Sequence, residues 1–127
     1  MTASSTTPWP VELRLAKDKR SLTIAFDDGK SFVLPAEMLR VMSPSAEVRG
    51  HSAEEKKTVG GKLNVSILAL EPVGNYAVRI VFDDTHNTGL YTWGYLAELG
   101  TGKDRLWADY LAELAQKGLS RERPGQK

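Results

Sequence analysis

Apolar residues that alternate with other residues on both sides of a tight turn constrain this fold most strongly. The alternating positions are Leu22, Ile24 and Phe26 before the turn, and Phe32 and Leu34 after it. The turn reads Asp-Asp-Gly-Lys, and its glycine accepts a positive φ without steric cost. A period of two places alternate side chains on one face of a strand. The sequence therefore predicts a β-hairpin with one buried face.

The same alternation predicts four more strands. One precedes the hairpin and has a face formed by Val11, Leu13 and Leu15. A long strand spans Leu63–Glu71, and Pro72–Asn75 turns the chain after it. The next strand has a face formed by Tyr76, Val78, Ile80 and Phe82. A longer turn over residues 83–89 then leads into a short strand, Leu90–Thr92.

Start and stop signals predict two short helices. Pro35 suits the first position of a helix, where a missing N–H costs nothing. This helix stops near Ser43, because the proline that follows disfavours helical geometry in the residue before it. Thr92 caps the second helix, Trp93–Leu99, and Gly100 ends it.

A third and longest helix is predicted near the C-terminus. Asp104 caps it and Gly118 closes it. Its apolar positions recur at helical spacing, and this stripe is more typical of a core-facing side than of a partner surface. The positions are Leu106, Trp107, Tyr110, Leu111 and Leu114.

Strands that come in adjacent pairs, without long crossover helices between them, favour an α+β fold. We expect a small single domain, mainly of antiparallel β-hairpins, with two or three helices and the longest at the C-terminus. The domain is predicted to span residues 9–118, between flexible tails at residues 1–8 and 119–127.

Composition excludes several classes of function. The 127 residues include no cysteine, which excludes disulfides, thiolate metal sites, thiol nucleophiles and cysteine-held iron–sulfur clusters. A net charge of +1 argues against a broad surface for nucleic acid or anionic lipid. The longest apolar stretch, Leu63–Leu70, is too short to cross a bilayer, and Met1–Pro10 lacks the pattern of a targeting segment. We therefore expect a cytoplasmic protein without nucleic-acid or membrane partners.

One histidine lies beside two carboxylates in the longer turn. His86 follows Asp83 and Asp84, a spacing that allows a small metal site or a plain turn in which His86 caps the chain. The plain turn is favoured, because transition-metal sites need three or four well-directed ligands and a partner for the histidine. Both interpretations remain open at this point.

A long polar segment, Ser43–Lys62, follows the first predicted helix. Connections longer than about 12–15 residues are uncommon in compact domains and are often functional or disordered. Ser43 or Ser45 with His51 supplies two members of a hydrolase triad, but no nucleophile elbow or oxyanion-donor pair accompanies them. Basic residues in or near this segment predict either a solvated loop or a binding patch: Arg40, Arg49, His51, Lys56, Lys57 and Lys62.

Five motifs occur in one order along the chain. They are L-x-I-x-F-D-D-G at 22–29, L-P-A-E-M-L-R at 34–40, S-P-S-A-E-V-R-G-H at 43–51, E-P-V-G-N-Y-A-V at 71–78 and F-D-D-T-H-N-T-G-L-Y-T-W-x-x-L at 82–96. Together they span about Pro10 to Gly100. This set resembles the family called DUF971, the gamma-butyrobetaine hydroxylase-like N-terminal domain.

The resemblance implies a zinc site, but this chain lacks most of its ligands. In the oxygenases of the family, three thiolates and a histidine hold a structural zinc. Carried over position by position, these ligands fall at Ser43, Ser45, Val48 and His86. A hydroxyl is a poor zinc ligand at neutral pH, and a valine is no ligand at all. The expectation is therefore a relative without zinc or another cofactor.

The resemblance also implies an accessory role. Family members occur as free-standing bacterial proteins, as N-terminal modules of iron-dependent oxygenases and at the C-terminal end of Mrp-like ATPases that carry iron–sulfur clusters. The facial triad and the large barrel of the oxygenases are absent from this sequence, so their activity is not implied. We expect a non-catalytic protein-interaction domain that is linked to iron–sulfur cluster or iron-enzyme handling.

The expected contact surface centres on the long segment and the turn at His86. Its residues are Arg40, Ser43, Ser45, Arg49, His51 and His86. The alternative is a small metal- or ligand-binding protein, or an enzyme, that uses His86 with Asp83 or Asp84. A homodimer through exposed strand edges is a further expectation.

Overall fold

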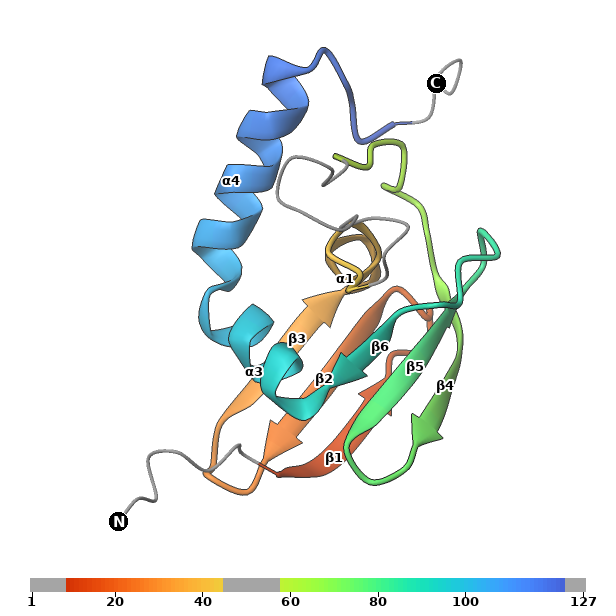
Figure 1. Ribbon diagram of the computed structural model, residues 1–127, viewed down its shortest axis with the longest axis vertical. Coiled ribbons are helices and arrows are strands. Elements are labelled where there is room, and N and C mark those ends of the chain that lie inside the picture. The colour runs from red at the N-terminus through yellow and green to blue at the C-terminus, as the bar shows by residue number, and fades with distance from the viewer. Residues whose placement is uncertain (1–8, 45–57, 123–127) are drawn as a thin grey trace.

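Two three-stranded antiparallel sheets and the helices around them form the part of the chain that the structure describes, residues 9–44 and 58–122 (Figure 1). The structure is a computed structural model. The expected α+β domain is confirmed: the sheets come from adjacent strands, and the longest helix lies at the C-terminal end. None of the helices in these residues is long and apolar enough to span a bilayer.

The first sheet has the order β1-β2-β3, with strands Pro10–Leu15, Ser21–Phe26 and Ser31–Pro35. The predicted hairpin is confirmed, since Ile24 pairs with Phe32 and Leu22 with Leu34. Gly29 has a φ of 86°, the conformation that the turn requires. Alternate residues of β2 are buried, as the period of two predicts.

The second sheet has the order β4-β5-β6, with strands Ile67–Val73, Ala77–Phe82 and Leu90–Thr92. The strand predicted at Leu63–Glu71 begins later, because the N–H groups of Leu63 and Val65 donate to the carbonyls of Arg121 and Lys62 instead. It also continues through Pro72, which was predicted to turn. A proline is tolerated there because β4 is an edge strand.

Residues of β5 confirm the predicted buried face with one exception. Val78, Ile80 and Phe82 are buried, but Tyr76 lies in the turn before the strand and is 52% exposed. The prediction for Tyr76 is wrong because the turn occupies residues 74–76, so that it begins two residues later than expected and includes Tyr76. Gly74 supplies the positive φ of that turn.

The two shorter helices are α1, Ala36–Val41, and α3, Trp93–Thr101. Pro35 is the N-cap of α1 rather than its first residue. The Thr92 cap is confirmed, since its hydroxyl accepts the N–H of Tyr95 at 3.2 Å. The predicted end of α3 at Gly100 is wrong, because this glycine lies inside the helix and leaves room for the Phe32 ring, 2.3 Å from where a Cβ would stand.

The longest helix is α4, Lys103–Gln116. The predicted cap at Asp104 is wrong, because Gly102 is the N-cap and Asp104 lies in the first turn. An acidic residue there still interacts favourably with the helix dipole. Gly118 follows the helix with a φ of 66°, which confirms the predicted closure.

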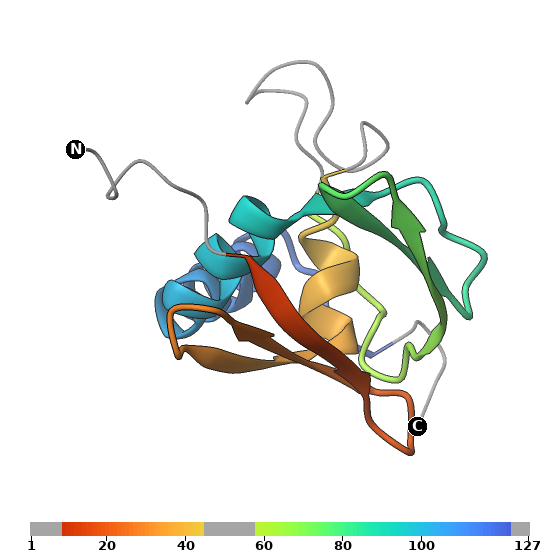
Figure 2. The same ribbon diagram turned by 90° about the horizontal axis from the view of Figure 1, so that it is seen from below.

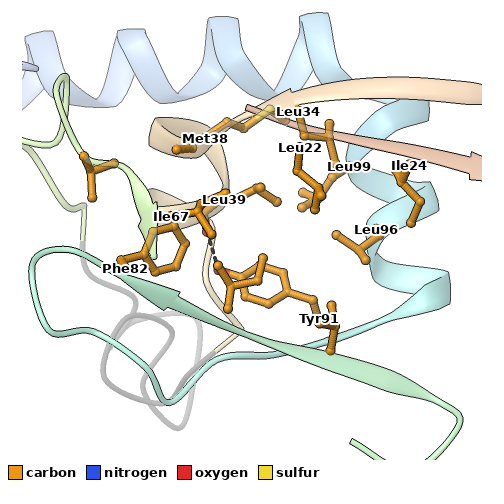
Figure 3. Packing of buried hydrophobic residues seen from close by; sticks show 14 of the residues in the cluster. Leu22, Ile24, Leu34, Met38, Leu39, Ile67, Phe82, Tyr91, Leu96 and Leu99 are labelled. Carbon is orange, nitrogen blue, oxygen red and sulfur yellow. Dashed lines mark hydrogen bonds between the residues drawn. The ribbon is translucent and has the colours of Figure 1, made fainter. Parts of the chain in front are cut away.

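The hydrophobic core lies between the two sheets and beneath α1 and α3 (Figure 3). Both sheets and both helices contribute fully buried side chains, among them Leu22, Ile24, Leu39, Phe82, Tyr91 and Leu96. The stripe on α4 packs partly as predicted: Tyr110 and Leu114 are buried, but Leu111 is 39% exposed. In Figure 2 the sheets diverge and α1 lies between them.

The segment after α4 returns to the body of the domain. The carbonyl of Ser120 accepts the N–H of Gly61, and the carbonyl of Arg121 accepts the N–H of Leu63. Arg121 also donates to both carboxylate oxygens of Glu37, at 2.7 and 2.9 Å. Residues 119–121, expected within a flexible tail, are therefore hydrogen-bonded to the domain.

Candidate functional site

Five polar residues meet where the end of α1 faces the turn between β5 and β6. We call them the Asp84 cluster: Arg40, Ser43, Lys62, Asp84 and His86. Arg40 comes from α1, and Ser43 follows its last turn. Asp84 and His86 come from the turn after β5. The cluster thus joins segments that lie about forty residues apart in the sequence.

Asp84 is the electrostatic centre of the cluster. Its Oδ2 accepts Arg40 Nε at 2.8 Å and Lys62 Nζ at 2.6 Å. Its Oδ1 accepts the backbone N–H of His86 at 3.1 Å. Burial raises the pKa of the carboxyl, but the hydrogen bonds from Lys62, the His86 N–H and Arg40 outweigh it and lower the pKa to about 2. Asp84 is therefore a fixed anion at neutral pH.

Ser43 and His86 form a second, buried contact. Ser43 Oγ lies 2.9 Å from His86 Nε2, and the two residues are 0% and 6% exposed. The neighbouring Tyr91 donates its hydroxyl to the carbonyl of Leu39. Burial raises the pKa of Tyr91, so its hydroxyl stays protonated. Both partners of the Ser43–His86 contact are therefore shielded from solvent.

Gly89 makes this contact possible. A Cβ at position 89 would stand 2.4 Å from Ser43 Oγ and 3.1 Å from the Tyr91 ring. We expect Gly89→Ala to rotate Ser43 away from His86 and to lower the free energy of unfolding by about 1–2 kcal/mol. Urea denaturation measures the loss. Gly118→Ala is an informative comparison, because its Cβ would meet nothing within 4 Å, so its cost comes from φ alone. Wild-type stability in Gly89→Ala would contradict the expectation.

The structure brings together part of the predicted contact surface. Arg40, Ser43 and His86 all lie in the Asp84 cluster. Ser45, Arg49 and His51 lie outside the described residues, as does Val48 of the zinc positions.

Asp83 does not join the cluster. Its carboxylate accepts the N–H and the hydroxyl of Ser66, at 3.1 and 2.9 Å, and so holds the start of β4 against the end of β5. The two adjacent carboxylates therefore have different structural partners. A metal site would need Asp83, Asp84 and His86 to converge. Instead, Asp84 accepts the N–H of His86, and the His86 ring lies against Ser43, so His86 does not cap the turn as expected.

Sequence reasoning did not single out Lys62 or Gly89 for this site. Lys62 was one of several basic residues in a segment without periodicity, and Gly89 was one of several turn residues. Lys62 binds Asp84 only because the fold places these two residues side by side. The place of Gly89 in the same motif as His86 was the one local signal for it.

The residues at the carried-over zinc positions do not fit zinc. Two of the four positions, Ser43 and His86, do lie in contact, so the placement implied by the resemblance holds for this pair. However, His86 Nε2 faces the Ser43 hydroxyl, which is a poor ligand. Within residues 9–44 and 58–122, no three His, Cys, Asp or Glu side chains gather as a metal site would require.

A chelator test follows from this donor set. We expect EDTA to leave the melting temperature unchanged, because a side-chain hydrogen bond occupies the position of the metal. Elemental analysis of protein prepared without a histidine tag is the companion measurement. A stoichiometric metal that is lost in His86→Ala would contradict the expectation and favour the metal-binding alternative.

Comparisons with known proteins give a consistent result. A family model described as gamma-butyrobetaine hydroxylase-like, N-terminal matches residues 13–97. Two proteins solved by solution NMR are similar at 49% and 50% identity, with TM-scores of 0.82 and 0.79. The match covers 96% and 95% of this chain, and 95% and 90% of theirs.

A crystal structure gives a third similarity. It is of a protein with unknown function from Acidithiobacillus ferrooxidans, described as a member of the DUF971 family. The identity is 38% and the TM-score 0.60, over 72% of this chain and 91% of that one. A search of curated proteins found no match.

Proposed function

Because this chain belongs to the gamma-butyrobetaine hydroxylase-like N-terminal family, also called DUF971, we propose that it is a non-catalytic accessory domain that binds a partner protein. The observation that carries the proposal is that the groups in the Asp84 cluster that could act as a nucleophile or a base are bonded to other residues of the cluster. Asp84 is held by two cations, and Ser43 by His86. These bonds build structure and leave no exposed nucleophile or base in the cluster.

The cluster also fixes both ends of the segment predicted to bind the partner. Ser43 precedes residues 45–57 and Lys62 follows them, and both residues are bound to the turn after β5 through His86 and Asp84. A binding element whose ends are fixed loses less conformational entropy on association. This supports a docking role for the surface around Arg40, Ser43, Ser45, Arg49, His51 and His86.

Charge favours an acidic partner surface. Arg40 and Lys62 share the single carboxylate of Asp84, which leaves one positive charge in excess. The link to iron–sulfur or iron enzymes rests on the resemblance alone and is the finer part of the proposal.

Site-specific photo-cross-linking in cells tests the docking surface. A photoreactive residue replaces His51 in one variant and Val33, 51% exposed on β3, in the control. We expect one protein to be captured at position 51 and not at 33. The captured protein is then purified and titrated against this chain, and an iron–sulfur or iron protein supports the finer proposal.

The binding titration carries its own control. Arg49→Ala/His51→Ala is expected to weaken binding at least tenfold, whereas Arg79→Ala, which removes an exposed cation from β5, leaves it unchanged. Identical capture at positions 33 and 51, or equal affinity in all variants, overturns the docking assignment.

A further inference from the structure

Among the described residues, the open strand edge is the outer edge of β1 over Glu12–Leu15, the regular part that follows an irregularity between Pro10 and Glu12. Two sheets present four edges: β1, β3, β4 and β6. Along β3, the carbonyl of Val33 accepts Lys103 Nζ at 2.8 Å, and the strand packs against α3. Edge β4 carries Pro72 and an irregularity at Leu68, and β6 is three residues long. These features protect strand edges from pairing.

The ladder between β1 and β2 shows which backbone groups of β1 face outward. The N–H of Ala16 donates to the carbonyl of Ser21, so this pair is a hydrogen-bonded one. Hydrogen-bonded pairs alternate with non-bonded pairs in an antiparallel ladder. Arg14 is therefore bonded to Thr23, and the N–H and C=O groups of Leu13 and Leu15 point away from β2.

The side chains of β1 are complementary to those of a second β1. In an antiparallel pair centred on Leu13, residue 12 of one copy lies opposite residue 14 of the other. Glu12 then faces Arg14 across the pair, and the symmetry repeats this contact. The side chains of Glu12 and Arg14 are 50% and 65% exposed, and they lie on one face of the strand. Within one chain, Arg14 Nη1 is 3.7 Å from Glu12 Oε2.

We propose that this chain associates with a second copy of itself through antiparallel pairing of β1 with β1, centred on Leu13. The outward N–H of each Leu13 donates to the carbonyl of the other, as a hydrogen-bonded pair requires. The pairing joins the two β1-β2-β3 sheets into one six-stranded sheet across a two-fold axis.

Exposed apolar side chains lie at the N-terminal end of the same strand edge. Val11, within β1, is 64% exposed, and Trp9, just before the strand, is 49% exposed. At the other end, the N–H of Ile67 donates to the carbonyl of Lys19, so the second sheet meets the β1–β2 turn there and the pairing extends no further than Leu15. In Figure 2 β1 crosses the near side of the molecule.

Such a dimer is weak, since so short a pairing buries less than the roughly 1,200 Å² of a standard interface. Sedimentation equilibrium of the full chain at low salt, up to about 1 mM protein, measures it. Glu12→Arg places arginine opposite arginine, and Arg14→Glu places glutamate opposite glutamate. We expect each single variant to raise the dissociation constant about tenfold or more.

Mixing the two single variants is the decisive arm. The arginine introduced at position 12 of one chain then faces the glutamate introduced at position 14 of the other. The second contact pairs the native Arg14 with the native Glu12, so we expect a heterodimer of wild-type affinity. The double variant Glu12→Arg/Arg14→Glu is expected to dimerise as wild type does. Arg79→Glu, a charge inversion on the other sheet, is the matched control and leaves association unchanged.

Two outcomes overturn the inference. The first is a wild-type chain that is monomeric throughout this concentration range. The second is a dimer that both single variants retain, because that dimer uses another surface. Circular dichroism of every variant confirms that the fold is intact, which is expected because both side chains are exposed. The inference does not depend on the proposed docking function.

Discussion

Arg121→Ala is expected to lower the free energy of unfolding by about 3 kcal/mol, because it leaves a buried carboxylate without its cation. Glu37 is 6% exposed, and both of its oxygens accept hydrogen bonds from Arg121. The Arg121 side chain is 41% exposed, so water screens part of the attraction and places the loss at the lower end for buried pairs. The guanidinium also stacks over the Trp107 ring, 5.4 Å from its centroid.

Urea denaturation at neutral pH measures this loss, and two variants bracket it. Arg79→Ala breaks an exposed pair with Glu71 and is expected to cost less than about 1 kcal/mol. Glu37→Met/Arg121→Ala removes both charges and is expected to recover most of the stability, since apolar replacement of a buried pair is often neutral. An Arg121→Ala loss no larger than that of Arg79→Ala would contradict the prediction.

The elements that the sequence predicted correctly are those set by neighbouring residues. The alternation around Gly29 and the cap at Thr92 involve residues within a few positions of one another, and both are confirmed. The errors at Pro72 and Gly100 have a common cause. Each residue is a local stop signal, but residues far away in the sequence determine its surroundings. Pro72 is tolerated because β4 is an edge strand, and Gly100 stays helical because the Phe32 ring packs against it.

The candidate site divides in the same way. The family motifs identified Ser43 and His86 as two positions of the family's zinc site, and the structure places these two residues in contact. Lys62 and Arg121 were not identified, because their partners Asp84 and Glu37 lie 22 and 84 residues away. Spacing along the chain carries no information about such pairs.

Asp84→Asn is expected to lower the free energy of unfolding by about 2 kcal/mol at pH 7. A pKa lowered from 3.8 to about 2 corresponds to roughly that amount of stabilisation of the charged form. The side chain is 19% exposed, so the interaction is partly shielded from solvent. The variant also leaves Arg40 and Lys62 without their shared carboxylate.

The pH profile of this difference tests its electrostatic origin. Because the pKa of Asp84 is lower in the folded state, its contribution is complete above about pH 4 and is lost as the pH falls toward 2. The stability difference between wild type and Asp84→Asn should therefore shrink over that range. Asp109→Asn, which changes an exposed carboxylate on α4, should show a small difference throughout. A difference for Asp84→Asn that stays constant from pH 7 to pH 2 would mean that packing or hydrogen-bond geometry, and not the charge held between Arg40 and Lys62, fixes this cluster.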